Sequence, residues 1–346
     1  MKYFSYFHLL PLLVFISCQP TGNTSDGTAE EQFIGEIRAV TPALASIIDT
    51  TAKIQILGEG FTWGEGPAWI PSQNKLLFSD VPENIVYSWD SIAGIDTFLS
   101  PSGFTGETTN STEPGANGLS LDLDGRLLLC QHGDRRIARW EGSWENPVAS
   151  YSTVAGRYDD NRFNSPNDLV VASNGNIYFT DPPYGLREKD DDPEKEIPFQ
   201  GVYLIKPDGE LFLLTDELSR PNGIALSPDE KTLYVANSDP QRAIWMAFDI
   251  LEDGRVENGR LFFDATPLTK ELRGLPDGLK VDQQGNLFAT GPGGVLILSP
   301  DGQHLGTIFT TQATANCAFG KDGQTLFMTA DMYLLAVPIL TTGVGF

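Results

Sequence analysis

The sequence predicts an all-β fold, a six-bladed β-propeller closed by an N-terminal strand. First, 35 Gly and 23 Pro with 20 Phe, 10 Tyr and 6 Trp among 346 residues favour short strands and tight turns. Second, one two-strand pattern restarts six times along the chain. Third, the last repeat is too short for a whole blade, and an unassigned strand-like segment precedes the first repeat.

Each repeat opens on an oxygen-bearing residue and continues with an apolar run, a Gly- or Asp-containing turn and a second apolar run. "NDLVVASNGNIYFTD" from Asn167 is typical. The six opening residues, spaced by 52, 50, 55, 55 and 39 residues, are Glu65, Asn117, Asn167, Asn222, Asp277 and Asn316. Further strand-like runs follow, such as "IVYSWD", so each unit is expected to be an antiparallel sheet of about four strands, as in propeller blades.

The two ends of the repeat region are complementary. Only 31 residues follow from Asn316 to the C-terminus, enough for three strands, whereas "AKIQILGEG" at residues 52–60 belongs to no repeat. We therefore expect that N-terminal strand to complete the last blade, giving a propeller over residues 45–346.

The N-terminus has the pattern of a targeting segment. Lys2 precedes an apolar stretch over residues 7–16, and Ser17 and Cys18 follow it, which resembles a bacterial lipoprotein signal. This predicts a signal peptide over residues 1–17, a flexible tether over residues 18–44 and a lipid anchor at Cys18 on the bacterial cell envelope. An ordinary signal peptide is the alternative.

The net charge limits the kinds of binding partner to expect, and the positions of the cysteines indicate whether they form a disulfide. A formal net charge of -23 would repel a phosphate backbone, so nucleic acid is not expected as a partner. Contact with a membrane is expected only through the lipid anchor. Cys130 and Cys317 fall within apolar runs, which favours two buried thiols over a disulfide.

The opening residues predict a cation site. The first strand of a propeller blade is the innermost, so the six openers should surround one mouth of the central channel. Asn or Asp before Gly is also a common turn former, and any single opener could be explained in that way. Six oxygen-bearing residues in register, including Glu65, favour a ring of hard ligands for Ca²⁺, Mg²⁺ or Mn²⁺.

The second strand of each repeat ends at the same mouth. His132 follows one such end directly and is a candidate proton carrier or substrate contact, although a surface histidine in a blade turn is equally compatible. The second-strand ends are Asp80, Gln131, Asp181, Asn237, Gly291 and Ala330.

Several longer motifs together resemble a known family. "EGPAW", "NSPNDLVV", "FTDPPYGL", "RPNGIALSPDEKTLYVANSD" and "LPDGLKVDQQGNLFATGPGG" are similar to the gluconolactonase arm of the senescence-marker-protein/gluconolactonase/luciferin-regenerating-enzyme family, over about residues 60–340. The resemblance implies a lactone hydrolase with one divalent cation, first of all Ca²⁺, with Mg²⁺, Mn²⁺ and Zn²⁺ as alternatives. Its implied metal ligands are Glu65, Asn167, Asn222 and Asp277.

The resemblance also implies a small sugar-acid lactone as the substrate. Asp277 is the expected general base, with His132 as the alternate. Relatives in the animal branch of that family hold substrate with an arginine two residues before the third-blade asparagine, where this chain has Ser165, so Arg162 is taken as the nearest candidate. The expected substrate contacts are Asn117, Arg162, Asp181 and Tyr184.

Two other functions compete with the lactone hydrolase. One is a non-catalytic propeller module that binds a glycan or a protein on the cell envelope. The other is a related propeller enzyme acting on aryl esters or organophosphates. No "GxSxG" motif is present in the sequence, so nothing supports a serine nucleophile of the α/β-hydrolase kind.

Overall fold

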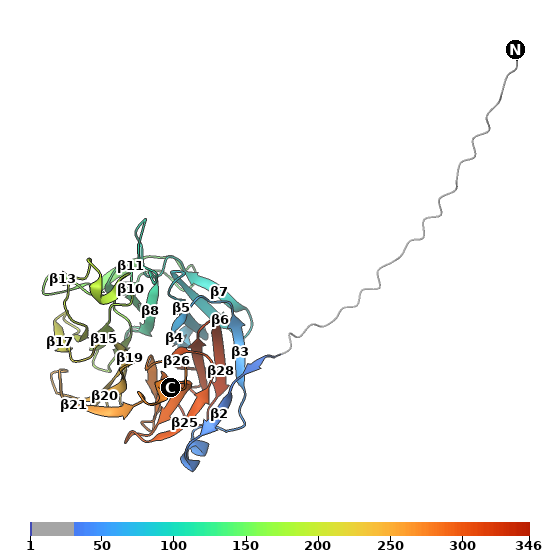
Figure 1. The fold of residues 1–346 in the computed structure, drawn as a ribbon. Helices are drawn as coiled ribbons and strands as arrows, with labels where there is room; N and C mark the ends of the chain where they lie inside the picture. Colours follow the sequence, from blue (N-terminus) through green and yellow to red (C-terminus); the bar gives the residue numbers. More distant parts are fainter. Residues whose placement is uncertain (2–30) are drawn as a thin grey trace. The chain divides into compact units, whose positions relative to one another are not determined.

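Six antiparallel sheets surround a common axis in the computed structural model of the chain (Figure 1). The structure describes Met1 and residues 31–346. Residues 2–17 of the expected signal peptide and residues 18–30 of the expected tether, which include Cys18, lie outside the described residues. Residues Gln32–Phe346 form one unit. The predicted six-bladed, all-β fold is confirmed.

Each blade begins with its innermost strand. The first three blades are β4 (Gly64–Ile70) to β7 (Gly94–Leu99), β8 (Ala116–Leu121) to β11 (Tyr151–Ala155), and β14 (Leu169–Val171) to β17 (Leu211–Thr215). The middle strands of these blades are β5 (Lys75–Asp80), β6 (Ile85–Asp90), β9 (Leu127–Gln131), β10 (Arg136–Trp140), β15 (Ile177–Asp181) and β16 (Gly201–Ile205). A hairpin of β12 (Arg157–Tyr158) and β13 (Asn161–Arg162) lies between the second and third blades in the sequence.

The remaining blades follow the same order. The fourth blade contains β18 (Pro221–Leu226), β19 (Thr232–Asp239), β20 (Arg242–Ile250) and β21 (Val256–Asp264). The fifth contains β22 (Leu279–Val281), β23 (Leu287–Gly291), β24 (Gly294–Leu298) and β25 (His304–Phe309), and the sixth begins with β26 (Thr314–Gly320), β27 (Thr325–Ala330) and β28 (Tyr333–Pro338). Each of the inner strands β4, β8, β14, β18, β22 and β26 contacts the next, and β26 contacts β4, so the ring is closed.

The N-terminal segment closes the ring, and it begins earlier than the sequence suggested. β3 (Ile54–Glu59) pairs antiparallel with β28, as expected. In addition, β2 (Glu36–Ala39) adds a fifth strand to the fifth blade by pairing with β25, and β1 (Phe33–Ile34) pairs with β3. The expected tether over residues 18–44 is therefore wrong for its C-terminal part, because that part completes two sheet edges.

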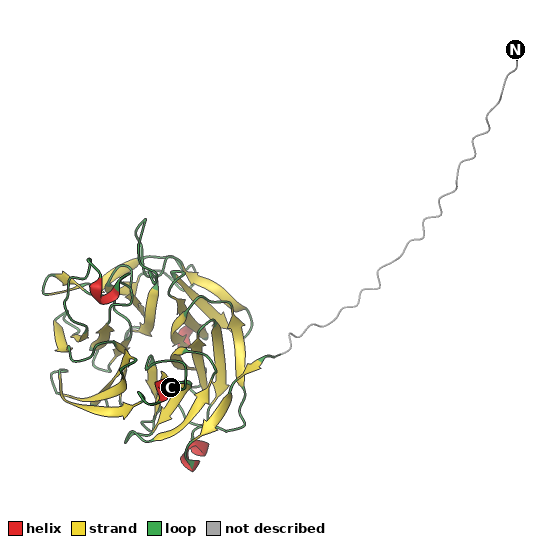
Figure 2. Cartoon of the chain, viewed as in Figure 1, coloured by secondary structure: helices red, strands yellow, loops and turns green. Residues whose placement is uncertain are grey.

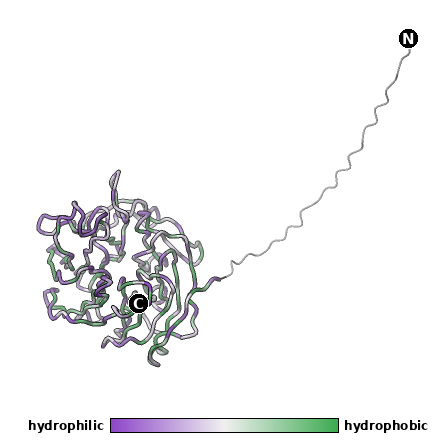
Figure 3. The backbone as a smooth tube through the Cα atoms, viewed as in Figure 1, coloured by the Kyte–Doolittle hydropathy of each residue, from purple (hydrophilic) through white to green (hydrophobic). Residues whose placement is uncertain are grey.

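Apolar side chains fill the space between blades. Figure 3 shows hydrophobic stretches distributed around the whole propeller, and in Figure 2 the few short red helices are segments between the yellow strands. These are four 3-10 helices among the described residues: η1 (Pro42–Ser46), η2 (Pro71–Gln73), η3 (Lys189–Asp191) and η4 (Leu268–Lys270). Within residues 31–346, none is long and apolar enough to span a membrane. Cys130 and Cys317 are buried free thiols, as predicted.

Glycines after the opening residues let neighbouring inner strands approach closely. A Cβ atom on Gly223 would lie 2.2 Å from the carbonyl oxygen of Asp277, the opener of the next blade, and one on Gly66 would lie 2.0 Å from that of Asn117. Hydroxyl groups connect the same layers, since Thr180 Oγ1 donates to the carbonyl oxygen of Asn222 at 2.6 Å. The Asn-Gly and Asp-Gly pairs thus serve the contact between blades.

Candidate active site

A cavity of about 780 Å³ opens at one mouth of the channel, where the inner strands begin. All four residues expected as metal ligands line it, and so does Asn117. Tyr184, which was expected to contact substrate, lines it as well. The structure thus brings together side chains that are separated by up to 212 positions in the sequence, from Glu65 to Asp277.

Local irregularities turn the opening side chains into the channel. The pairing of β4 with β5 shifts register between Glu65 and Ala68, and that of β18 with β19 shifts between Pro221 and Ile224, around Asn222. Such bulges change the direction of a side chain that would otherwise follow the sheet alternation. Asn167 and Asp277 instead precede their strands, held by hydrogen bonds from their N–H groups to Thr180 O and Thr290 O, at 2.8 and 3.0 Å.

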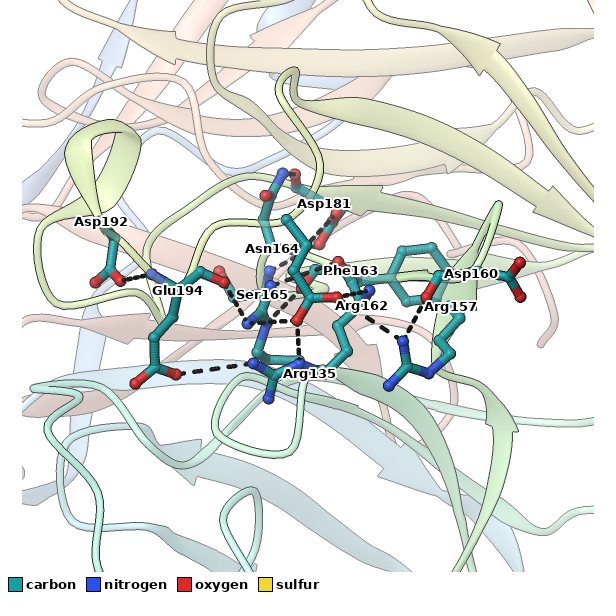
Figure 4. A network of polar contacts seen from close by, with 11 residues as sticks. Arg135, Arg157, Asp160, Arg162, Phe163, Asn164, Ser165, Asp181, Asp192 and Glu194 are labelled. Atoms are coloured by element: carbon teal, nitrogen blue, oxygen red, sulfur yellow. Dashed lines mark hydrogen bonds and ion pairs between the residues drawn. The ribbon is translucent and has the colours of Figure 1, made fainter.

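The second-strand ends hold the loops that lead into the openers. Asp181 accepts hydrogen bonds from the N–H groups of Asn164 and Ser165, both at 2.8 Å, just before Asn167 (Figure 4). In the same way, the Asp80 carboxylate accepts hydrogen bonds from the N–H groups of Thr62 and Trp63, which lie just before Glu65 in the sequence. Asp181 is fully buried and does not line the cavity, so the expected substrate contact at this residue is wrong.

Two carboxylates in the cavity wall are destabilised in their charged forms. Burial raises the pKa of Glu65 to about 8, against hydrogen bonds donated by Trp63 Nε1 and the Gly66 N–H, both at 3.3 Å. Burial also raises the pKa of Asp277 well above its ordinary value, and the negative charge of Glu65 adds to this shift. A cation between the two carboxylates would remove this penalty.

Unpaired oxygens at the same place provide a test of whether the site fits a cation. Asn117 Oδ1, Asn222 Oδ1 and Asp277 Oδ1 are buried and have no hydrogen-bond partner among the described residues. Buried polar atoms normally have a hydrogen-bond partner. Three buried oxygens without one in the same cavity wall therefore fit a hard cation that binds oxygen ligands. No cluster of three or more His, Cys, Asp or Glu side chains suited to a metal exists within residues 31–346, so any ion here depends on amide oxygens.

The ring of openers is less regular than expected. Asn316 is not among the residues that line the cavity; its Nδ2 donates to Asp168 Oδ2 at 3.4 Å. Asp168 is buried and occupies the position after the opener, where four other repeats have glycine. It is a third carboxylate near the site, since it raises the pKa of both Glu65 and Asp277.

Two expected site residues lie elsewhere. Arg162 and His132 line a separate cavity of about 360 Å³ and not the larger one. Arg162 forms ion pairs with Glu196 and Glu194 in a polar network (Figure 4). His132 is fully buried, and burial lowers its pKa to about 4. The prediction that His132 could act as the general base at the channel mouth is therefore wrong, as is the substrate contact at Arg162.

The structure adds residues that the sequence interpretation missed. Arg220, Lys189 and Glu113 line the larger cavity. Arg220 had a recognisable signal, because it stands two residues before the opener Asn222 in "RPNG", and it is ion-paired with Asp190. Lys189 and Glu113 come from segments between strands that carry no repeat, so no periodic signal pointed to them.

The fold and the site define a six-bladed propeller protein with carboxylate and amide oxygens converging at one channel mouth. The chain belongs to the family described as the SMP-30/Gluconolactonase/LRE-like region, which it matches over residues 63–331. A Zymomonas mobilis protein named gluconolactonase is 40% identical over 334 residues, covering 94% of this chain and 91% of the relative. Regucalcin from Bos taurus is 26% identical over 287 residues, covering 81% and 87%.

A solved structure agrees with these sequence matches. A gluconolactonase from Xanthomonas campestris is 34% identical and superimposes with a TM-score of 0.77, covering 89% of this chain and 97% of that chain. Together, these relatives confirm the expected family and the expected enzyme class, a lactone hydrolase.

Proposed function

We propose that the chain is a divalent-metal-dependent hydrolase that opens a small sugar-acid lactone. The observation that carries this proposal is the set of unpaired buried oxygens of Asn222 and Asp277 beside Glu65 in a cavity of about 780 Å³. Such a cavity is large enough for a small polar ligand. The named gluconolactonases among the relatives support the substrate class, and the likeness to regucalcin supports Ca²⁺ as the ion.

The residues expected to hold the ion have suitable chemistry. Glu65 and Asp277 supply two negative charges, which balance a divalent cation, while Asn167 and Asn222 add neutral oxygens. Four side-chain oxygens are fewer than the roughly six to eight that Ca²⁺ takes, so positions remain for water and substrate. When bound there, a divalent cation polarises a lactone carbonyl and stabilises negative charge that develops on its oxygen.

Asp277 is the residue best placed to take a proton from the attacking water. It lines the cavity, and its Oδ1 has no hydrogen-bond partner among the described residues. Asn117 and Tyr184 lie in the same wall and can hold hydroxyl groups of the sugar ring, together with Arg220. The products are a free carboxylate and the alcohol released from the ring.

The experiment is a lactone panel assayed on residues 19–346 with and without chelator. We expect one divalent ion per chain by elemental analysis, hydrolysis of a sugar-acid lactone, and loss of at least about 90% of the rate on chelation, restored by Ca²⁺. An apo-protein of unchanged rate would contradict the metal requirement. Absence of turnover on every lactone and ester would favour the binding module.

We further propose that the protein is anchored to the bacterial cell envelope through a lipid on Cys18. The support is the order of Lys2, the apolar stretch over residues 7–16, Ser17 and Cys18. The test is set out with the N-terminal truncations in the Discussion.

A further inference from the structure

Glu113 links the larger cavity to a residue behind its wall. It comes from the segment between β7 and β8, lines the cavity, and has a side chain that is 34% exposed. Its Oε2 lies 3.9 Å from Nδ1 of His132. His132 in turn lines the smaller cavity, so the pair stands between the two cavities.

The backbone fixes this pair. The N–H of His132 donates to Gly115 O, and the N–H of Gly133 donates to Pro114 O, both at 3.2 Å. The chain beside Glu113 is therefore tied to the chain beside His132 by two hydrogen bonds. His132 is fully buried and neither of its ring nitrogens has a hydrogen-bond partner among the described residues. Glu113 Oε2, at 3.9 Å from Nδ1, is too far for a hydrogen bond here but can reach it by a small movement of the half-exposed Glu113 side chain.

Lactone opening needs a proton donor as well as a base. Water attacks the carbonyl carbon and gives a proton to Asp277, and the bond between that carbon and the ring oxygen then breaks. The ring oxygen leaves as an alkoxide unless it receives a proton, and a positioned acid contributes about a hundredfold or more to such a step. Asp277 could return the proton that it took from water only if it reached both the attacking water and the ring oxygen, and Glu113 is a second carboxyl group in the same cavity wall that can supply a proton from another direction.

We propose that Glu113 is the catalytic acid that protonates the leaving ring oxygen, and that His132 is the residue that positions it. This inference rests on the proposed function. In the step, the O–H bond of Glu113 breaks, the ring oxygen becomes a hydroxyl group, and Glu113 is left as a carboxylate. Asp277 then releases to solvent the proton that it took from water, and Glu113 takes up one proton from solvent, so that one lactone and one water yield one hydroxy acid, which ionises to its carboxylate and a proton.

The surroundings of Glu113 favour its acid form. Burial raises the pKa of Glu113, although the nearby positive charge of Lys189 acts against this shift. Glu65 is a second negative group within electrostatic reach, since Glu113 in turn raises the pKa of Glu65. His132 stays neutral, because burial lowers its pKa to about 4, and the one N–H of its neutral ring can donate to a carboxyl oxygen of Glu113 while the acid proton remains available for the ring oxygen.

The leaving group provides the decisive test. Glucono-1,5-lactone releases an alkoxide, whereas dihydrocoumarin releases a phenolate, which needs no proton. Glu113→Gln should lower kcat on gluconolactone about a hundredfold with KM changed less than about threefold, and should lower kcat on dihydrocoumarin less than about threefold. Glu107→Gln is the matched control, because Glu107 is exposed in the same segment and lines neither cavity.

Each contrary result has a distinct meaning. An equal loss on both lactones, an unchanged kcat on gluconolactone, or a rise in KM alone overturns the role of Glu113 as the acid. Circular dichroism and metal content establish that the variant is folded, and Glu113→Asp, which keeps the acid at a shorter reach, should recover part of kcat. If the parent opens no lactone, the proposed function fails first, and this inference with it.

The positioning role of His132 is tested by coupling. His132→Asn should lower kcat on gluconolactone about tenfold in the parent but less than about twofold in the Glu113→Gln background. The reason is that the effects of substitutions at two coupled residues are not additive. A full tenfold loss in both backgrounds would show that His132 acts only on the fold.

Discussion

Asp277 combines two demands on one side chain. In the proposed function it supplies charge to the ion as a ligand and accepts a proton from water as a base. Its Oδ1 is unpaired, its backbone N–H is fixed to Thr290 O, and burial together with Glu65 raises its pKa. The two demands can be separated by an amide of the same size, which keeps an oxygen and removes the charge.

Asp277→Asn should weaken metal binding and, with metal saturating, lower kcat on a lactone about a hundredfold or more. Saturating metal is needed because lost occupancy would mimic lost chemistry. The measurements are metal affinity by calorimetry and kcat at several ion concentrations, with Asn117→Asp as a comparison that adds charge to the same wall. An Asp277→Asn variant as fast as the parent with the ion bound would leave Asp277 as a ligand only.

Single residues show where sequence reasoning succeeds. Glu65, Asn167, Asn222 and Asp277 could be placed together because they occupy one position of a repeat, and a closed ring converts equal positions into neighbours. The side chain of His132 could not be placed from the sequence. It follows the end of a strand by one residue, and at such a position the side chain can face either the channel or the far side of the loop. Glu113 and Lys189 lie outside the repeat and had no such constraint.

At the scale of elements, the proposed ion site requires the inner strands to approach closely enough for their openers to reach one ion. The glycine after each of four openers allows this, and Gly223 is the clearest example, since it faces backbone atoms of Asp277 and Gly278. The two nearest atoms to a Cβ there are backbone atoms at 2.2 and 2.7 Å, which cannot move aside as a side chain can, and Leu279 Cδ2 follows at 2.8 Å. The contact between blades and the geometry of the site therefore depend on the same atoms.

Gly223→Ala should lower the free energy of unfolding by about 2 kcal/mol and weaken metal binding, because the new Cβ would displace Asp277. Thermal unfolding and calorimetry measure the two effects. Gly156→Ala is the control, since a Cβ there would have its nearest contact at 3.5 Å, with Thr153. Equal stability and equal affinity in the two variants would show that the blades can adjust.

The elements themselves were predictable to different degrees. The first two strands of a blade, such as β14 and β15, were evident from paired apolar runs, and the role of β3 followed from the short last repeat. The pairing of β2 with β25 was not evident, because "EIRA" is short and mostly exposed and its partner lies about 270 positions away. Nothing local in such a segment distinguishes an added edge strand from a linker.

At the scale of the whole molecule, stability depends on joining the two ends of the ring. Without β1 to β3, the sixth blade would keep three strands and expose the edge of β28, and the fifth would lose β2. The same segment carries Leu44, Ile48 and Ile54, which are almost completely buried in the core between the last two blades. Large aliphatic residues of this kind contribute about 2–5 kcal/mol each, against a total stability of about 5–15 kcal/mol.

The N-terminal segment should therefore divide into an anchor and a closing unit near residue 31. A chain beginning at Gln32 should unfold at the same temperature as residues 19–346, whereas one beginning at Gly60 should show no cooperative transition at 25 °C or above, since the lost burial approaches the whole stability. In a Gram-negative host the full chain should sediment with membranes, and Cys18→Ala should remain uncleaved or be released. Thermal unfolding by circular dichroism and fractionation with mass spectrometry of Cys18 measure the two parts. A folded, metal-binding protein that begins at Gly60 would contradict the closing role, and equal solubility of both full-length forms without lipid on Cys18 would make the protein an ordinary secreted one.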